Sequence, residues 1–162
     1  MLSSLEPLRA DHAPAVLAFE VANREYFAAS IADRGDDFFD RFPLHFAELL
    51  DEQDAGRCAC YVLVDEDGAV LGRFNLYYLD SATADLGYRV AEHAAGQGVA
   101  TATVRELTRL AADRHGLRTL RAGTSERNIA SQKVLLKAGF VFVGPAEVGG
   151  KAGRRFELDL EH

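Results

Sequence analysis

The chain has 162 residues, a length that suits one domain with one sizeable core. Its formal net charge of −7 argues against nucleic acid as the main partner, because phosphate backbones select basic surfaces. No apolar run approaches the length of a membrane span, and Met1–Glu6 lacks the character of a signal peptide. We therefore expect a cytoplasmic globular protein with a domain over residues 1–160, and we interpret 161–162 as a possible tag remnant.

The first half of the chain predicts two helices between strands. Asp11 suits a helix N-cap, Pro14 is tolerated in a first helical turn, and Gly56 suits a helix C-terminus. Asp65–Gly68 has the composition of a hairpin turn. The expected elements are a strand (Leu5–Arg9), a helix from Asp11 to about Phe27, a loop (Ser30–Asp37), a helix (Phe38–Asp54) and two strands (Cys58–Val64 and Val70–Leu79).

The two cysteines of the chain, Cys58 and Cys60, stand two apart in the first of these paired strands. Their side chains therefore lie on one face of the strand, where a disulfide is disfavoured by geometry. No further Cys/His set completes a metal site. We expect a pair of buried thiols and no metal.

The second half alternates strands and helices. The pattern predicts a strand (Ala84–Val90), a helix (Ala100–His115) ended by Gly116, a strand (Leu117–Thr124), a short helix (Asn128–Ala138), a strand (Phe140–Val143) and a last strand on which Phe156, Leu158 and Leu160 alternate. On the long helix, Val104, Leu107, Leu110 and Ala111 should face inward. Strands separated by a helix favour parallel pairing, so the chain is α/β, with a mixed sheet and helices on both faces.

A glycine-containing loop joins the strand ending at Val90 to the long helix. Backbone N–H groups are unpaired at such a helix start, and glycines let an anion approach them. The loop residues are Gly96, Gln97, Gly98, Val99, Ala100 and Thr101. Thr101 stands where a dinucleotide fingerprint needs glycine, and Gly-Lys-Ser/Thr of a phosphate loop is absent. The alternative is a tight turn that uses glycine only for its geometry.

A second motif, Asn128–Ser131, opens the short helix. Asn128 suits an N-cap, and Ser131 falls one turn into the helix. Alone, this pattern is more typical of a capped helix with a serine facing solvent than of a functional site.

Together these motifs resemble the GNAT superfamily of N-acetyltransferases, most closely the RimJ/RimL type that acetylates the N-termini of ribosomal proteins. The pieces that carry the resemblance are Leu86–Val90, Gly96–Ala100, Asn128–Ser131 and Lys137–Phe140. The element order matches over nearly the whole chain and implies a mostly antiparallel sheet with a central parallel strand pair. Ala95 departs from the family pattern, which has Gln or Arg there.

The resemblance implies acetyl-CoA as co-substrate and no metal. The pantetheine arm would lie along Tyr88 to Val90, bonded by the Val90 backbone, and the pyrophosphate would bind the N–H groups from Gln97 to Thr101. Asn128 matches a residue that hydrogen-bonds pantetheine, and Ser131 matches a proton donor to the departing thiolate.

The implied reaction is direct attack of a neutral primary amine on the thioester in a ternary complex, so a base must remove a proton from the amine. Asp85 lies where some family members keep a carboxylate. The other candidates are Glu20, Glu25, His45 and Tyr88, each of which also suits a surface charge or a core aromatic, whereas His93 and His115 suit solvated helix ends.

The acceptor would be a protein N-terminus or a small amine. Relatives are often dimers, so a homodimer is expected, with no nucleic-acid or membrane partner. The alternative function is a binding module that holds acyl-CoA without turnover.

Overall fold

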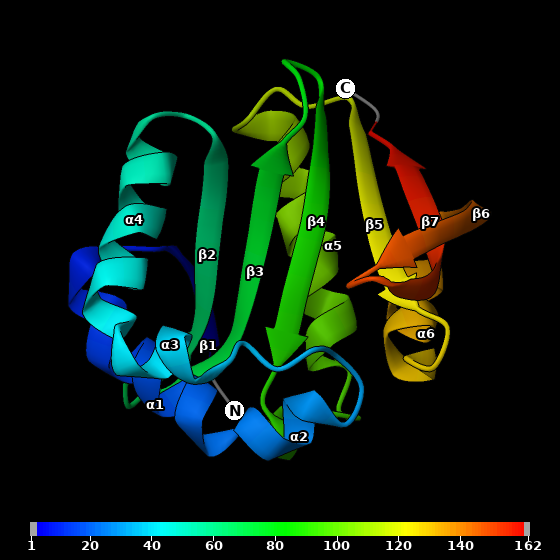
Figure 1. Ribbon diagram of the computed structural model, residues 1–162. Coiled ribbons are helices and arrows are strands. Elements are labelled where there is room, and N and C mark those ends of the chain that lie inside the picture. The colour runs from blue at the N-terminus through cyan, green and yellow to red at the C-terminus, as the bar shows by residue number, and fades with distance from the viewer. Residues whose placement is uncertain (1–2, 161–162) are drawn as a thin grey trace. The chain divides into compact units, whose positions relative to one another are not determined.

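The computed structural model describes residues 3–160, and the predicted tag remnant at 161–162 lies outside them. A seven-stranded mixed sheet runs in the order β1-β2-β3-β4-β5-β7-β6 (Figure 1). The chain forms two compact units, one of residues up to 75 with 88–94, the other of 76–87 with residues from 95 onward. The predicted α/β class is confirmed, and each unit is described by itself below.

The first unit contains the four N-terminal helices. Its elements are β1 (Ser3–Pro7), α1 (Ala13–Ala22), α2 (Arg24–Ala28), α3 (Asp36–Asp40), α4 (Phe42–Asp54), β2 (Cys58–Asp65) and parts of β3 (Val70–Tyr78) and β4 (Thr83–Val90). β1 pairs antiparallel with β2, and the Leu8 N–H continues the ladder by donating to the Cys60 carbonyl at 2.9 Å.

The single helix predicted from Asp11 to Phe27 is wrong, because the chain breaks at Asn23. The Asn23 Nδ2 donates to the Phe19 carbonyl at 2.9 Å, and its Oδ1 accepts the Glu92 N–H at 3.0 Å. An asparagine that bonds nearby backbone in this way competes with the helical ladder. The predicted N-cap is also wrong: Asp11 pairs with Arg9, and His12 holds the cap position of α1.

The helix predicted over Phe38–Asp54 is also two helices, α3 and α4, which meet at Arg41 with φ −116° and ψ 30°. Pro43 lies in the first turn of α4, where its missing N–H costs nothing, whereas a continuous helix would press its ring against the preceding turn. α3 begins at Asp36, inside the predicted loop.

Phenylalanines from α1, α2 and α4 form much of the core of the first unit. Phe19, Phe27, Phe42 and Phe46 are buried, and the ring centroids of Phe19 and Phe27 lie 5.5 Å apart, as do those of Phe42 and Phe46. Burying side chains of this size contributes roughly 1.5–3 kcal/mol each.

Cys58 and Cys60 belong to the same core, which confirms the predicted pair of buried thiols. Their sulfur atoms are 3.7 Å apart. Burial raises the pKa of both thiols, that of Cys60 to about 12.

The hairpin turn predicted between β2 and β3 is confirmed. The Gly68 N–H donates to the Asp65 carbonyl at 3.1 Å, and the Asp65 carboxylate accepts the N–H groups of Asp67 and Ala69, each at 2.9 Å. Gly68 has a φ of +84°, a conformation that favours glycine.

The second unit holds the rest of β3 and β4 with α5 (Val99–Asp113), β5 (Thr119–Ser125), α6 (Ile129–Lys137), β6 (Val141–Val148) and β7 (Lys151–Asp159). β4 and β5 pair in parallel, as the intervening helix predicts, whereas β7 pairs antiparallel with both β5 and β6 (Figure 1). Val104, Leu107 and Ala111 of α5 are buried as predicted, and Leu110 is partly buried.

β6 is longer than the predicted strand over Phe140–Val143. A shift in its register with β7 between Phe142 and Gly144 lets the strand continue past Pro145. Such a bulge, on a strand at the edge of the sheet, is where proline is tolerated. Among the helices described, none is long and apolar enough to cross a membrane.

Candidate functional site

The predicted anion-binding loop opens α5 in the second unit. Gly96 and Gly98 have φ values of +75° and +77°, and the helix begins at Val99 with no side chain capping it. A Cβ placed on either glycine would meet no atom within 4 Å, so the loop backbone faces open space. The first N–H groups of a 15-residue helix therefore stand behind an exposed turn, an arrangement suited to a phosphate.

Asn128 and Ser131 are brought together at the start of α6, as predicted. The Ser131 N–H donates to the Asn128 Oδ1 at 3.2 Å, which makes Asn128 the N-cap. In residues 3–160 the Asn128 Nδ2 has no hydrogen-bond acceptor, so its two N–H groups can serve a ligand. Gln132 fixes the turn before the helix by donating to the carbonyls of Ser125 and Glu126 at 3.2 and 3.1 Å.

The parallel pairing of β4 with β5 is short within this unit. It covers three residue pairs and ends at Asp85 and Arg121, while β5 continues to Ser125. Asp85, the predicted base, is half-exposed and lies 3.6 Å from the Arg121 Nε. Within the described residues of this unit, β5 thus continues for four residues beyond the pair that Arg121 forms with Asp85 of β4.

Thr124 lies on this part of β5 and was not singled out by the sequence. Its side chain is buried, and its Oγ1 has no hydrogen-bond partner among residues 3–160. A buried hydroxyl without a partner costs free energy, and a bound polar group would satisfy it. No local pattern distinguishes such a threonine from the many threonines of ordinary strands.

Tyr88 and Val90, predicted to line the pantetheine arm, lie at the end of β4 in the first unit. The Tyr88 ring stacks on Phe74, with centroids 5.6 Å apart and an interplanar angle of 9°. The next residue, Ala91, donates its N–H to the Leu71 carbonyl at 2.8 Å and so holds the strand end against β3. The role of both residues toward the cofactor stays a prediction.

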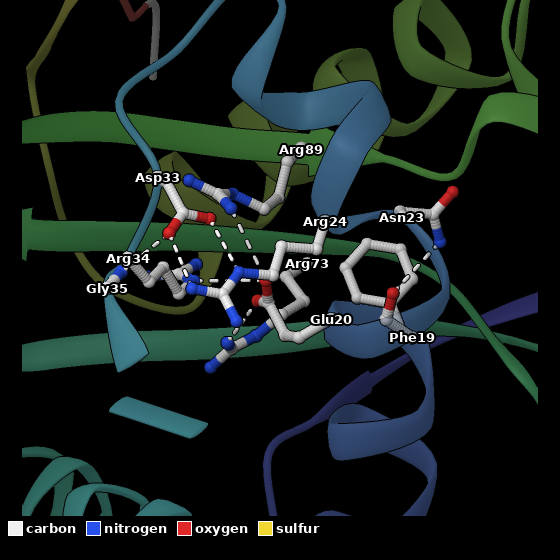
Figure 2. Close-up of polar contacts among 9 residues, drawn as sticks. All are labelled: Phe19, Glu20, Asn23, Arg24, Asp33, Arg34, Gly35, Arg73 and Arg89. Atoms are coloured by element: carbon white, nitrogen blue, oxygen red, sulfur yellow. Dashed lines mark hydrogen bonds and ion pairs between the residues drawn. The ribbon is translucent and has the colours of Figure 1, made fainter. Parts of the chain in front are cut away.

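Glu20 is buried beneath three arginines of the first unit (Figure 2). Its carboxylate accepts from Arg34 Nε at 3.0 Å, Arg73 Nη1 at 2.8 Å and Arg89 Nη1 at 3.3 Å. Burial acts to raise the pKa of Glu20, but the Arg34 hydrogen bond and the three positive charges outweigh it and hold the pKa below its ordinary value. Because Glu20 is already committed to these cations, it is unsuited to accept a proton from an amine.

The remaining base candidates have other surroundings. Glu25 is exposed, and the His45 Nε2 contacts the exposed Asp37 at 3.0 Å. His115 is not the solvated helix end that the sequence suggests: it is partly buried and its Nδ1 lies 3.1 Å from the Tyr78 hydroxyl. Burial, and next the charge of Arg114, lower its pKa. His93 is exposed.

Comparisons with known proteins identify the family of this domain. A model of the GNAT acetyltransferase domain matches residues 4–141. The probable N-acetyltransferase YjcK of Bacillus subtilis (strain 168) is 26% identical over 144 residues, which cover 84% of this chain and 78% of that protein.

Solved structures match along almost the whole chain. The ribosomal-protein-S5-alanine acetyltransferase of Vibrio fischeri matches with a TM-score of 0.88 at 18% identity. The match covers 98% of this chain and 93% of the Vibrio fischeri chain. RimJ of Mycobacterium smegmatis, in complex with CoA-disulfide, matches with a TM-score of 0.84 at 22% identity, over 97% of this chain and 81% of the RimJ chain. Spermidine N-acetyltransferase of Vibrio cholerae, in complex with CoA and spermine, matches with a TM-score of 0.80 at 14% identity, over 98% of this chain and 95% of the Vibrio cholerae chain.

At these identities the structural likeness shows the fold, and the domain match over most of the chain shows the family. The chain belongs to the GNAT family of acetyltransferases and is an acetyl-CoA-dependent acyltransferase.

Proposed function

We propose that the protein transfers the acetyl group of acetyl-CoA to a primary amine, by direct attack of the amine on the thioester. The observation that carries the proposal is the uncapped start of α5 behind Gly96 and Gly98, where a Cβ would meet only open space. Main-chain N–H groups from Gln97 to Thr101 would hold the pyrophosphate there, helped by the positive end of the helix dipole. Because Ala95 stands where the family pattern has Gln or Arg, we expect weaker or altered cofactor binding and not its loss, since the backbone amides make most of the contacts.

Two polar groups of the second unit support binding of the pantetheine arm, which carries amides that need partners. The Asn128 Nδ2 would donate to the arm while its Oδ1 caps α6, and the buried Thr124 Oγ1 would gain a partner there. When bound, acetyl-CoA supplies an activated acyl group. Ser131 would protonate the departing sulfur, and Asp85, beside Arg121, would remove the proton from the amine.

The acceptor in this proposal is a protein N-terminus or a small amine. Relatives of the same fold are named for both classes: one acetylates an alanine of ribosomal protein S5, and another acts on spermidine. A homodimer is expected from the resemblance.

Release of CoA across a panel of amines and N-terminal peptides tests the proposal. It is paired with a binding measurement on Gly98→Trp, whose side chain would fill the phosphate position. We expect this variant to lose at least tenfold in acetyl-CoA affinity by calorimetry. Gly68→Trp is the matched control, since Gly68 also has a positive φ and open space at its Cβ but lies in the β2–β3 hairpin. Equal affinity of the two variants would remove the loop from the cofactor site. Tight binding without turnover on any amine would instead favour the non-catalytic module.

Asp85→Asn tests the base. If Asp85 removes the amine proton, the variant should lose about 100-fold in kcat, the scale of one acid–base group, and its activity should recover as the amine itself deprotonates at high pH. The control is Asp67→Asn in the β2–β3 hairpin. A pH–rate profile that keeps its wild-type shape and height would exclude Asp85 from this role.

A further inference from the structure

Glu20 and its three arginine partners, Arg34, Arg73 and Arg89, form a group that we call the Glu20 cluster. This cluster carries more positive than negative charge. Arg34, Arg73 and Arg89 all bond the same carboxylate, and no other Asp or Glu of residues 3–160 lies within ion-pair distance of them. Two positive charges therefore remain uncompensated. The whole chain has a net charge of −7, so the cluster reverses the sign of the molecule locally.

This surplus is only partly buried. The exposed fractions of the side chains rise from 7% at Arg73 to 17% at Arg89 and 29% at Arg34. The guanidinium groups of Arg89 and Arg34 lie over the rings of Phe27 and Phe38 at 4.8 and 4.9 Å. An aromatic ring thus covers one face of each of these two guanidinium groups. Along the edge of each guanidinium group there are further N–H groups that do not bond Glu20. Planar edges of this kind match the oxygens of a carboxylate or a phosphate.

The surroundings of Arg89 disfavour its charged form. Burial, followed by the charge of Arg34, lowers the pKa of Arg89 to about 10, against the opposing pull of Glu20. A guanidinium is rarely placed where its charged form is disfavoured, because the cost is borne by the folded state. An anion bound beside it would relieve that cost.

The loop before α3 holds Arg34 in place. Arg24 donates to both carboxylate oxygens of Asp33, at 3.0 and 2.8 Å, and the Gly35 N–H donates to Asp33 at 3.0 Å (Figure 2). Gly35 adopts a φ of +90°. Because the residues on both sides of Arg34 are fixed, its side chain is aimed at Glu20 before any ligand arrives, which lowers the entropy cost of binding.

Arg89 belongs to the strand segment that the resemblance predicts for the acetyl donor. It lies between Tyr88 and Val90 on β4, the two residues given to the donor, and alternation along a strand directs its side chain to the other face. We propose that Arg34 and Arg89, backed by Arg73, form a subsite for an oxyanion carried by the acceptor amine, either a carboxylate or a phosphate. This substrate class rests on the proposed function.

Acceptors that differ only in the anionic group test the subsite. One series pairs ω-amino carboxylates of three to six carbons with their amides, and another pairs O-phosphoethanolamine with ethanolamine. We expect the anionic member to have at least tenfold higher kcat/KM, mainly through KM. Arg34→Gln should abolish the preference, and Arg34→Lys, which keeps the charge without the planar fork, should keep part of it. Arg57→Gln removes an exposed arginine paired with Glu52 and should leave the preference intact.

A direct binding measurement separates this inference from the proposed function. The arginine Nε–H signals of the intact protein are followed by NMR during titration with inorganic phosphate and with succinate. Saturable shifts of Arg34 and Arg89 without turnover of any amine would leave the anion site standing and defeat the proposed reaction. Equal kcat/KM for the paired acceptors would overturn the subsite. A higher KM for acetyl-CoA in Arg34→Gln, with the acceptor preference unchanged, would overturn it too, since the anion would then belong to the donor.

Discussion

At the scale of single residues, the surroundings of Glu20 decide its role. A carboxylate with three arginine partners is already the counter-ion of a buried cluster, so removing its charge leaves cations unbalanced. Breaking a buried ion pair from one side costs roughly 3–5 kcal/mol. We therefore expect Glu20→Gln to lower the free energy of unfolding by about that amount at pH 7, measured by urea unfolding.

The pH dependence of this loss has a definite sign. The pKa of Glu20 is lower in the folded protein than its ordinary value of 4.5, so its contribution is complete above that value and disappears as the pH falls through the folded pKa. The stability gap between wild type and Glu20→Gln should hold from pH 7 to about pH 5 and close at lower pH. Glu66→Gln, in an exposed position of the hairpin, should show no gap. Parallel stability curves down to pH 2 would show that Glu20 is not held ionised by the arginines.

At the scale of elements, the start of α6 combines a structural and a binding role in one side chain. The Asn128 Oδ1 caps the helix and its Nδ2 is available to a ligand, so two variants separate these roles. Asn128→Asp keeps the capping oxygen and should retain stability, while acetyl-CoA affinity falls about tenfold for the lost hydrogen bond. Asn128→Ala should lose both, with about 1 kcal/mol of stability. Full affinity in Asn128→Asp, measured by calorimetry, would mean that Asn128 serves only the helix.

The sequence predicted the elements whose signals are local. The glycines of the α5 loop, the cap at Asn128 and the hairpin at Asp65–Gly68 each depend on a few consecutive residues, and all three have the predicted form. The break at Asn23 combines a local bond to the Phe19 carbonyl with a bond from the Glu92 N–H, 69 positions away, so a local window of sequence contains only part of its cause. Pro43 lies just after the division between α3 and α4, but the apolar pattern over Phe38–Asp54 predicted one helix.

The Glu20 cluster could not be predicted from the sequence either, because its residues are far apart along the chain. Its members stand at positions 20, 34, 73 and 89, on a helix, a loop and two strands, and only the fold assembles them. The sequence offered Glu20 as one of several candidate bases, together with Glu25 and His45 of the first two predicted helices. Because three arginines surround Glu20 in the folded protein, its carboxylate is a counter-ion of these arginines and not a proton acceptor.

At the scale of the whole molecule, the chain passes between its two compact units three times, after residues 75, 87 and 94. β3 and β4 each contribute residues to both units, so neither unit is a continuous piece of chain that could fold first and alone. We expect a single cooperative unfolding transition. Leu135→Ala in α6 removes a fully buried side chain and should cost 2–5 kcal/mol, about the range for leucine truncation. Hydrogen exchange in urea should report the same lowered midpoint for peptides of both units, and two separate midpoints would contradict this expectation.

The two sulfur atoms on β2 also determine how the molecule can be labelled. A thiol with a pKa near 12, shut inside a phenylalanine core, has almost no thiolate at neutral pH and no path to a maleimide. A cysteine placed on the exposed turn at Asp67 would therefore take up one fluorophore while the native pair stays silent. Site-selective dyes for fluorescence anisotropy can thus be attached to the otherwise unaltered protein.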